Sequence, residues 1–117
     1  MQRNHHQPAS AEDRIIRAAL DGVVAAGYQV AVWNGEDWSS GPSADVDAFL
    51  GSLRATDADT LHLVRDGAAT SSWVLLVYGN DPCEVMADWT VDIDELLLPA
   101  VTLADAIEAA EATRRTR

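Results

Sequence analysis

The chain has 117 residues, 48% of them hydrophobic, which fits one domain with an ordinary buried core. Its formal net charge is −11 at pH 7, with 19 acidic side chains against 8 basic ones, so its surface should repel nucleic acid and anionic lipid while attracting basic proteins. No apolar run approaches the roughly 20 residues of a membrane span, and the single cysteine cannot close an internal disulfide, so we expect a cytoplasmic protein.

The two ends of the chain differ from its middle. Residues 1–9 consist largely of Gln, Asn, His and Pro, which have little to bury, and they predict a disordered arm. A single domain is expected to follow over residues 10–114. Residues 115–117 form a basic tail, where arginines meet the negative end of a helix dipole.

The first half of the domain predicts two helices with a hairpin between them. Ser10 is typical of a helix N-cap and Gly27 of a residue that ends a helix, with apolar side chains at helical spacing between them. Asn34-Gly35 tolerates the positive φ angles of a type I′ turn, so it predicts a tight hairpin. The expected elements are a helix at 10–27, strands at 28–33 and 36–39, and a helix at 43–53.

The second half predicts three strands and then two helices. The short links between the strands require antiparallel neighbours. Asp92 and Thr102 each resemble the start of a capping box, and Pro99 is expected to end the first of the two helices. The expected strands are 60–65, 71–78 and 84–89. The sequence therefore predicts an α+β domain with a mainly antiparallel sheet of four or five strands and three or four helices, in the order α-β-β-α-β-β-β-α-α.

The strand at 71–78 is apolar on both faces, which predicts a place in the middle of the sheet. If the helices cover only one face of the sheet, the other face exposes an apolar patch. A homodimer or a partner-binding surface is then expected, with Trp33, Trp73 and Tyr78 as its contact residues. If the helices cover both faces, no such patch remains, and the sequence leaves both arrangements open.

Motifs for catalysis are missing from the sequence. His62 lies between two leucines of a strand and is expected to be a structural or surface histidine, and Cys83 a small buried residue. A P-loop needs a lysine, which the chain lacks, and the carboxylate pairs lack the glycine and the distal glutamate of a calcium loop. We expect no catalytic residue, no cofactor and no dedicated metal site.

The acidic side chains are the main functional signal. Between Asp21 and Glu111 there are 17 acidic residues and two basic ones. Several acids serve as helix caps or turn residues. Carboxylates two residues apart in an extended strand stand about 6.6 Å from each other, close to twice the ~3.4 Å between phosphates of a DNA strand. The acids expected to bind a partner are Asp57, Asp59, Asp88, Asp92, Asp94 and Glu95; the alternative is that the acids serve solubility or adaptation to salt.

Several short segments carry a resemblance to known proteins. They are Ala25-Ala26-Gly27-Tyr28 with Val30 and Val32, Asn34-Gly35-Glu36 with Trp38, Asp57 with Asp59-Thr60-Leu61, Trp73 to Asn80, Glu84-Val85, and Ala87-Asp88-Trp89-Thr90. On these segments, roughly residues 25–98 resemble uncharacterised small acidic proteins of phages, plasmids and other bacterial mobile elements. The resemblance brings no known activity. It implies a mobile-element setting, where compact acidic proteins often bind and block host proteins.

The sequence thus predicts a non-enzymatic, acidic interaction protein whose partner is a basic protein. Such a protein could inhibit a host nucleic-acid-binding protein by imitating nucleic acid, without binding nucleic acid or membrane itself. Two alternatives stay open. One is a small enzyme dependent on a divalent metal at the acids from Asp88 to Glu95, and the other is a dimeric accessory subunit.

Overall fold

The computed structural model describes residues 10–115 of the chain. In chain order its elements are α1 (Ala11–Ala25), β1 (Gln29–Trp33), β2 (Trp38–Ser43), α2 (Val46–Ser52), β3 (Ala58–Arg65), β4 (Ala68–Val77), the 3-10 turn η1 (Pro82–Glu84), β5 (Met86–Trp89), the 3-10 turn η2 (Val91–Ile93) and α3 (Leu98–Arg115). The predicted arm at 1–9 lies outside the described residues, and so do residues 116–117 of the predicted basic tail.

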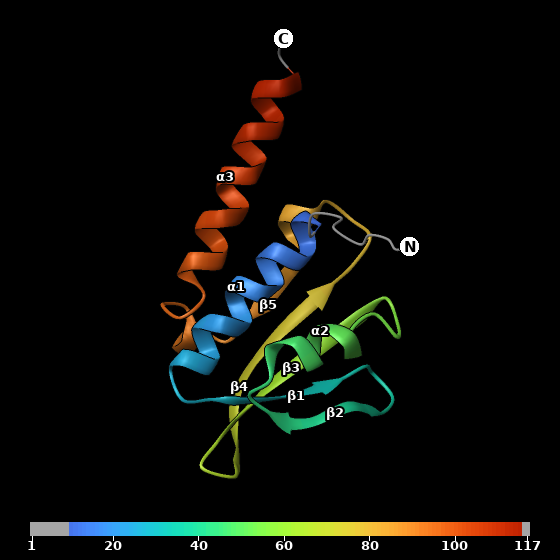
Figure 1. Cartoon of the computed structure of the whole chain (residues 1–117), viewed down its shortest axis with the longest axis vertical. Coiled ribbons are helices and arrows are strands. Elements are labelled where there is room, and N and C mark those ends of the chain that lie inside the picture. Colours follow the sequence, from blue (N-terminus) through green and yellow to red (C-terminus); the bar gives the residue numbers. More distant parts are fainter. Residues whose placement is uncertain (1–9, 116–117) are drawn as a thin grey trace, which may run out of the picture.

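The strands form one antiparallel sheet in the order β2-β1-β3-β4-β5 (Figure 1). With its three α-helices this is the predicted α+β domain, and the prediction of the fold is confirmed. β4 is an interior strand between β3 and β5, although β3 is the central one.

Helix α1 forms where its capping residues and its apolar stripe predict it. The Ser10 hydroxyl accepts a hydrogen bond of 3.1 Å from the backbone N–H of Asp13, and Gly27 follows the helix with a φ of 97°.

At Gly22 the helix approaches the segment before α3 so closely that a Cβ would lie 2.4 Å from the Leu96 carbonyl oxygen. Glycine is therefore required there for packing rather than for backbone conformation.

The hairpin between β1 and β2 is longer than predicted. Trp33 pairs with Trp38, so the loop has four residues instead of two. The Asn34 side chain closes it, because its Oδ1 accepts hydrogen bonds of 2.8 Å from the backbone N–H groups of both Glu36 and Asp37.

The last two predicted helices are also different. The helix expected from Asp92 is only the turn η2, and Pro99 lies in the first turn of α3 instead of ending a helix. Proline is well tolerated there, because the first N–H groups of a helix have no acceptor within the helix. Helix α3 consequently begins four residues before Thr102, at Leu98.

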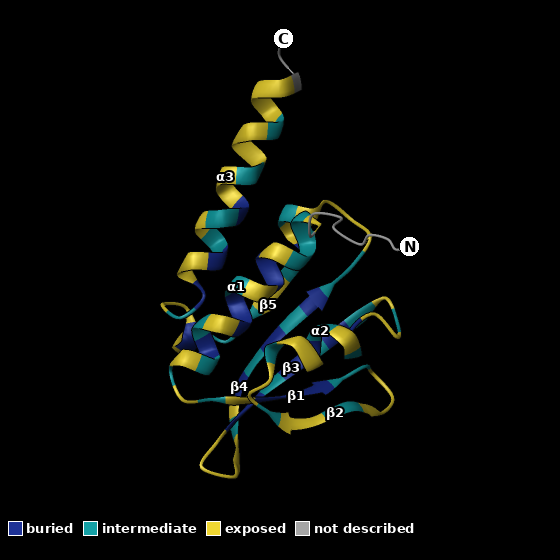
Figure 2. Cartoon of the chain, viewed as in Figure 1, coloured by how far each residue is buried: buried dark blue, intermediate teal, exposed yellow. Residues whose placement is uncertain are grey.

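All three helices pack on the same face of the sheet. Side chains from α1, α2 and α3 (Ile16, Phe49 and Ala100) belong to one buried cluster with alternate residues of the strands. The strand members are Val30 and Val32 of β1, Leu61 and Leu63 of β3, and Val74 and Leu76 of β4. Figure 2 shows this burial along the central strands. The structure thus decides between the two arrangements that the sequence left open, and one face of the sheet has no helix of residues 10–115 over it.

Both edges of the sheet are short or irregular. β2 contains Pro42 and pairs with β1 with two shifts of register, while β5 has only four residues. Proline occurs in sheets mainly at such edges, since it has no N–H to donate.

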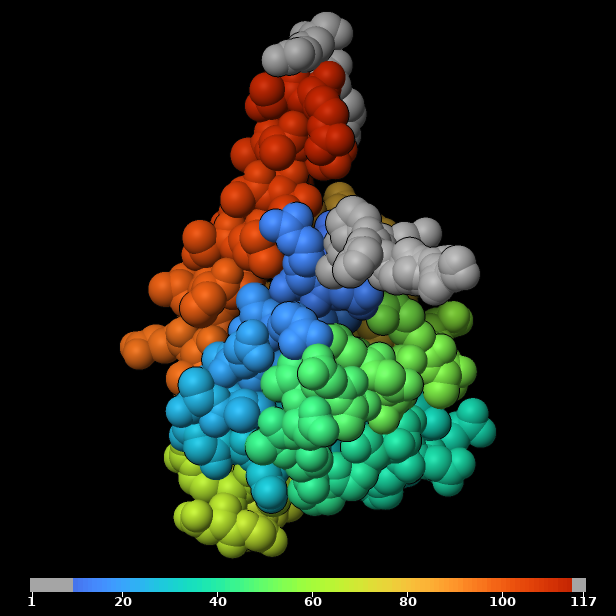
Figure 3. Space-filling model, viewed as in Figure 1, coloured from blue at the N-terminus to red at the C-terminus, as the bar shows by residue number. Residues whose placement is uncertain are grey.

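Helix α3 extends beyond the rest of the molecule. Its inner part packs through Leu103, Ala104 and Ile107, and its outer turns stand clear in Figures 1 and 3. Among the described residues no helix is both long and apolar enough to cross a membrane.

Candidate functional site

The face of the sheet that turns away from the helices is lined by aromatic and aliphatic side chains. Two rows of residues lie side by side across the strands: Ala31, His62 and Trp73 form one, and Trp33, Thr60 and Leu75 form the other. We call this surface the open face. Its residues are Ala31, Trp33, Trp38, Pro42, Thr60, His62, Val64, Ala69, Trp73 and Leu75.

Three aromatic rings contact one another on the open face. The Trp38 ring lies 5.1 Å from the Trp33 ring and 5.2 Å from the His62 ring, at interplanar angles of 66° and 67°. Such edge-to-face contacts are favourable and hold Trp38 against the sheet. Trp38 nevertheless stays 56% exposed, so it forms a raised apolar rim.

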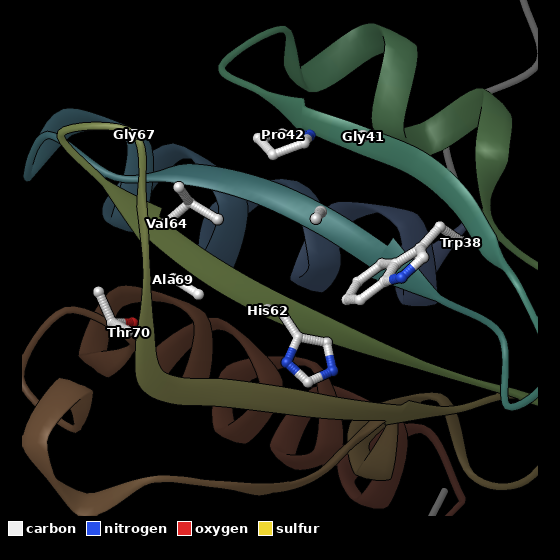
Figure 4. A pocket seen from close by; sticks show the side chains of 9 residues that line it. Trp38, Gly41, Pro42, His62, Val64, Gly67, Ala69 and Thr70 are labelled. Atoms are coloured by element: carbon white, nitrogen blue, oxygen red, sulfur yellow. The ribbon is translucent and has the colours of Figure 1, made fainter.

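Beside this rim lies a groove of about 640 Å³. β1 and β3 form its floor, and β2 and the start of β4 form its sides; the lining residues are Ala31, Trp38, Gly41, Pro42, His62, Val64, Gly67, Ala69 and Thr70. Figure 4 shows the Trp38 ring directed toward His62 at one end and Gly67 at the other, with the helices behind the sheet. The Thr70 hydroxyl already donates to the Leu63 carbonyl at 2.7 Å, so the groove offers an almost entirely apolar surface.

The histidine of the open face is suited to contact rather than to catalysis. Burial lowers the pKa of His62, so its imidazole is neutral at pH 7. Cys83 lies in η1 and lines cavities that do not include His62, so the two do not form a dyad. Burial and the nearby Asp81 carboxylate raise the pKa of the Cys83 thiol, which keeps it protonated and weakly nucleophilic.

The open face also carries no formal charge. None of its ten residues is Asp, Glu, Lys or Arg, although the chain has a net charge of −11. Among the described residues, acids lie at its borders: Asp88 of β5 pairs with Leu75 and shares its side of the sheet, Asp37 precedes Trp38, and Asp66 precedes Gly67. The charge of the protein is therefore carried by its other surfaces.

The structure contradicts one of the predicted partner-binding acids. Asp59 is 1% exposed, and its Oδ2 accepts hydrogen bonds from the Tyr78 hydroxyl at 2.6 Å and from the Arg54 backbone N–H at 2.9 Å. It therefore cannot form an exposed row of carboxylates with Asp57.

The other predicted acids are exposed but lie at two ends of β4. Asp57 is near the end of the strand, where its carbonyl accepts from the Tyr78 N–H. Asp88 lies in β5 opposite Leu75, and Asp92, Asp94 and Glu95 follow β5, where the Ser72 hydroxyl of β4 donates to Asp92. That hydrogen bond lowers the pKa of Asp92, so its carboxylate stays ionised at neutral pH. The predicted acidic face is thus reduced to these four residues.

Tyr78 was predicted in the dimer contact, and this prediction is wrong. Its hydroxyl binds Asp59, and the Arg54 guanidinium lies 4.8 Å from the centre of its ring. Arg54 in turn forms ion pairs of 2.9 Å with Glu12 and 2.8 Å with Asp13 of α1. Tyr78 therefore belongs to a polar cluster that joins the end of β4 to α1, away from the open face.

Trp33 and Trp73, two of the residues expected at a dimer contact, lie on the open face, while Trp38 and His62 were missed as members of the same surface. The signal for Trp38 was its position across the hairpin from Trp33.

Within residues 10–115, no three His, Cys, Asp or Glu side chains gather in a way that could hold a metal ion. The acids from Asp88 to Glu95 thus do not form a metal centre in the described structure.

Comparisons with known proteins add no further constraint. No protein-family model matches the chain, and neither the curated proteins nor the solved structures give a match. The resemblance to small proteins of mobile elements therefore stays a prediction.

Proposed function

We propose that this protein is a non-enzymatic interaction protein that binds another protein chain through the open face of its sheet. The observation that supports this is an uncharged, tryptophan-rich face on a protein with a net charge of −11. Large apolar patches are rare on isolated monomers, and the centres of protein interfaces are enriched in Trp and depleted of charge.

The groove and the rim give this face the features of a binding hot spot. Trp38 combines a large exposed apolar surface with a position fixed by two rings, so little conformational entropy is lost when it is covered. The groove beside it is lined mostly by small side chains and can accept large ones.

The test is capture of binding partners by the immobilised full chain. The discriminating variant is Ala69→Glu, which puts a charge in the groove at an exposed position. The control is Ala110→Glu, which adds the same charge at an exposed position of α3. Loss of a partner with Ala69→Glu but not with Ala110→Glu supports the proposal; equal capture by both variants contradicts it.

A second candidate function uses the acids that remain exposed. Asp88, Asp92, Asp94 and Glu95 lie within eight residues on β5, on η2 and in the turn after η2, and they could attract the basic groove of a nucleic-acid-binding protein. This candidate predicts capture that falls steeply with salt and that is lost when Asp88 and Glu95 are changed to Asn and Gln. Capture that persists at high salt and in this double variant contradicts it.

A further inference from the structure

We infer that the open face binds the open face of a second copy of this chain, forming a twofold dimer with two sheets back to back. This inference rests on the proposed function and names the partner. Three features of the open face support it: its charge, its shape and its area.

The charge of the second copy is known, because it has the same sequence and the same net charge of −11. Two such chains repel each other least where neither carries charge, and the ten residues of the open face carry none. With the faces in contact, the helices lie on the two outsides, and both sheets separate the charges on their outer surfaces. The acids at the border of the face, such as Asp88 and Asp37, still repel each other between copies, and salt screens that repulsion.

The shape of the open face is self-complementary. A twofold interface joins one patch to itself, so a rim on one copy needs a groove on the same face of the other. The open face has both side by side: the aromatic rim of Trp38 and the groove between Pro42 and Ala69. A twofold axis between rim and groove sets each Trp38 over the groove of the other copy.

The area of the open face fits a weak, transient dimer. Its residues lie on four strands, β2, β1, β3 and β4, which are spaced about 4.8 Å apart and average about seven residues at about 3.4 Å each, so they cover about 460 Å². Two copies together would cover about 900 Å², below the ~1,200 Å² at which stable interfaces begin and in the range of transient ones. We therefore expect a dissociation constant of tens to hundreds of micromolar rather than an obligate dimer.

Sedimentation velocity of the full chain tests this dimer, at protein concentrations from about 1 µM to about 500 µM. The wild type should shift with concentration toward twice the 12.6 kDa of one chain. The dimer should strengthen between about 0.02 M and about 0.5 M NaCl, because salt screens the repulsion between two anionic copies. Binding of a basic partner would have the opposite dependence on salt.

Three variants, one of them a control, locate the interface. Ala69→Glu should stay monomeric at all these concentrations, while Ala110→Glu should dimerise like the wild type. Trp38→Ala should raise the dissociation constant about 30-fold, as expected when a central tryptophan is removed from an interface. Circular dichroism of each variant should match the wild type, because all three positions are exposed.

The other outcomes distinguish this inference from the proposed function. A wild type that stays monomeric throughout overturns the dimer. If that monomer captures a different protein and Ala69→Glu loses it, the proposed function stands with another partner. If native mass spectrometry shows a monomer with a small molecule bound, and Ala69→Glu lacks it, the groove is a ligand site and the dimer is wrong. If the wild type dimerises but Ala69→Glu dimerises equally well, another surface makes the contact, which also overturns the inference.

Discussion

The Tyr78 hydroxyl donates a hydrogen bond of 2.6 Å to Oδ2 of Asp59, a carboxylate that is 1% exposed. Asp59 lies in β3 and Tyr78 directly follows the adjacent strand β4, and the same Oδ2 also accepts from the backbone N–H of Arg54. A buried carboxylate is costly without hydrogen bonds, and among the described residues Oδ1 has no partner, so the two bonds to Oδ2 are what couple the sheet to the loop before β3.

The first prediction concerns Asp59. Asp59→Ala should lower the free energy of unfolding by about 3 kcal/mol, because it leaves the Tyr78 hydroxyl and the Arg54 N–H without their acceptor. Urea unfolding followed by circular dichroism measures this. The matched control is Asp57→Ala, an exposed acid two residues away, which should change stability by less than about 0.5 kcal/mol. Equal effects of the two changes would show that Asp59 is not structurally engaged.

The second prediction concerns stability at alkaline pH. Burial and the hydrogen bond to Asp59 raise the pKa of Tyr78 above its ordinary value of about 10. The folded state therefore holds the phenol proton more tightly than the unfolded state does. The stability that this contributes is complete below the unfolded pKa of about 10, and it decreases as pH rises from there toward the higher folded pKa.

Ultraviolet absorbance of a Tyr28→Phe variant checks this, because Tyr78 is then the only tyrosine. Its ionisation should begin only well above pH ~10, together with unfolding. Ionisation of the folded protein near pH ~10 would contradict the prediction. The variant Tyr78→Phe should lose the alkaline decrease in stability.

The third prediction reverses the usual effect of removing a helical glycine. Gly→Ala inside a helix generally stabilises by up to about 1 kcal/mol. Gly22→Ala should instead destabilise by about 2 kcal/mol, because its Cβ would lie 2.4 Å from a backbone oxygen of Leu96 that cannot move independently. Gly51→Ala in α2 is the control, since nothing lies within 4 Å of its Cβ, and it should be neutral or stabilising. Thermal unfolding compares the two, and a stable Gly22→Ala would contradict the close approach.

The fourth prediction concerns His62. Because burial lowers its pKa, NMR titration of its ring should show protonation below the ~6.5 of a free histidine. The folded state disfavours the charged ring, so this contribution to stability is present above pH ~6.5 and is lost as pH falls through the folded pKa. His62→Gln should remove that part of the pH dependence. A ring that titrates at or above ~6.5 would show that His62 is fully solvated.

The sequence predicted the fold because short turns between apolar strands leave few alternatives. The links after β3 and between β4 and β5 are too short for anything but antiparallel neighbours, and this fixes much of the sheet. Pro99 was misplaced because the local rule is ambiguous: proline both ends helices and begins them. Only the packing of the following residues against α1 decides between the two.

The candidate site was less predictable. Asp59 lies two residues before Leu61 and four before Leu63. Because side chains of a strand alternate between its two faces, this spacing already places the Asp59 side chain on the core face of β3. What makes burial of its charge acceptable is contact with Tyr78 and Arg54, which local sequence does not reveal. Nor does the sequence show which face of the sheet the helices cover. β4 is apolar on both faces, and only tertiary packing distinguishes the two.

The two sheet edges bear on how copies of this chain can accumulate. A fibril grows when one chain adds its strand to the exposed edge of another, which requires a long, regular edge with free N–H groups. Here Pro42 and two register shifts interrupt one edge, and the other offers only the four residues of β5. Association through the apolar surface should therefore stop at a closed pair, and concentrated solutions should not give the ~4.7 Å cross-β reflection of amyloid.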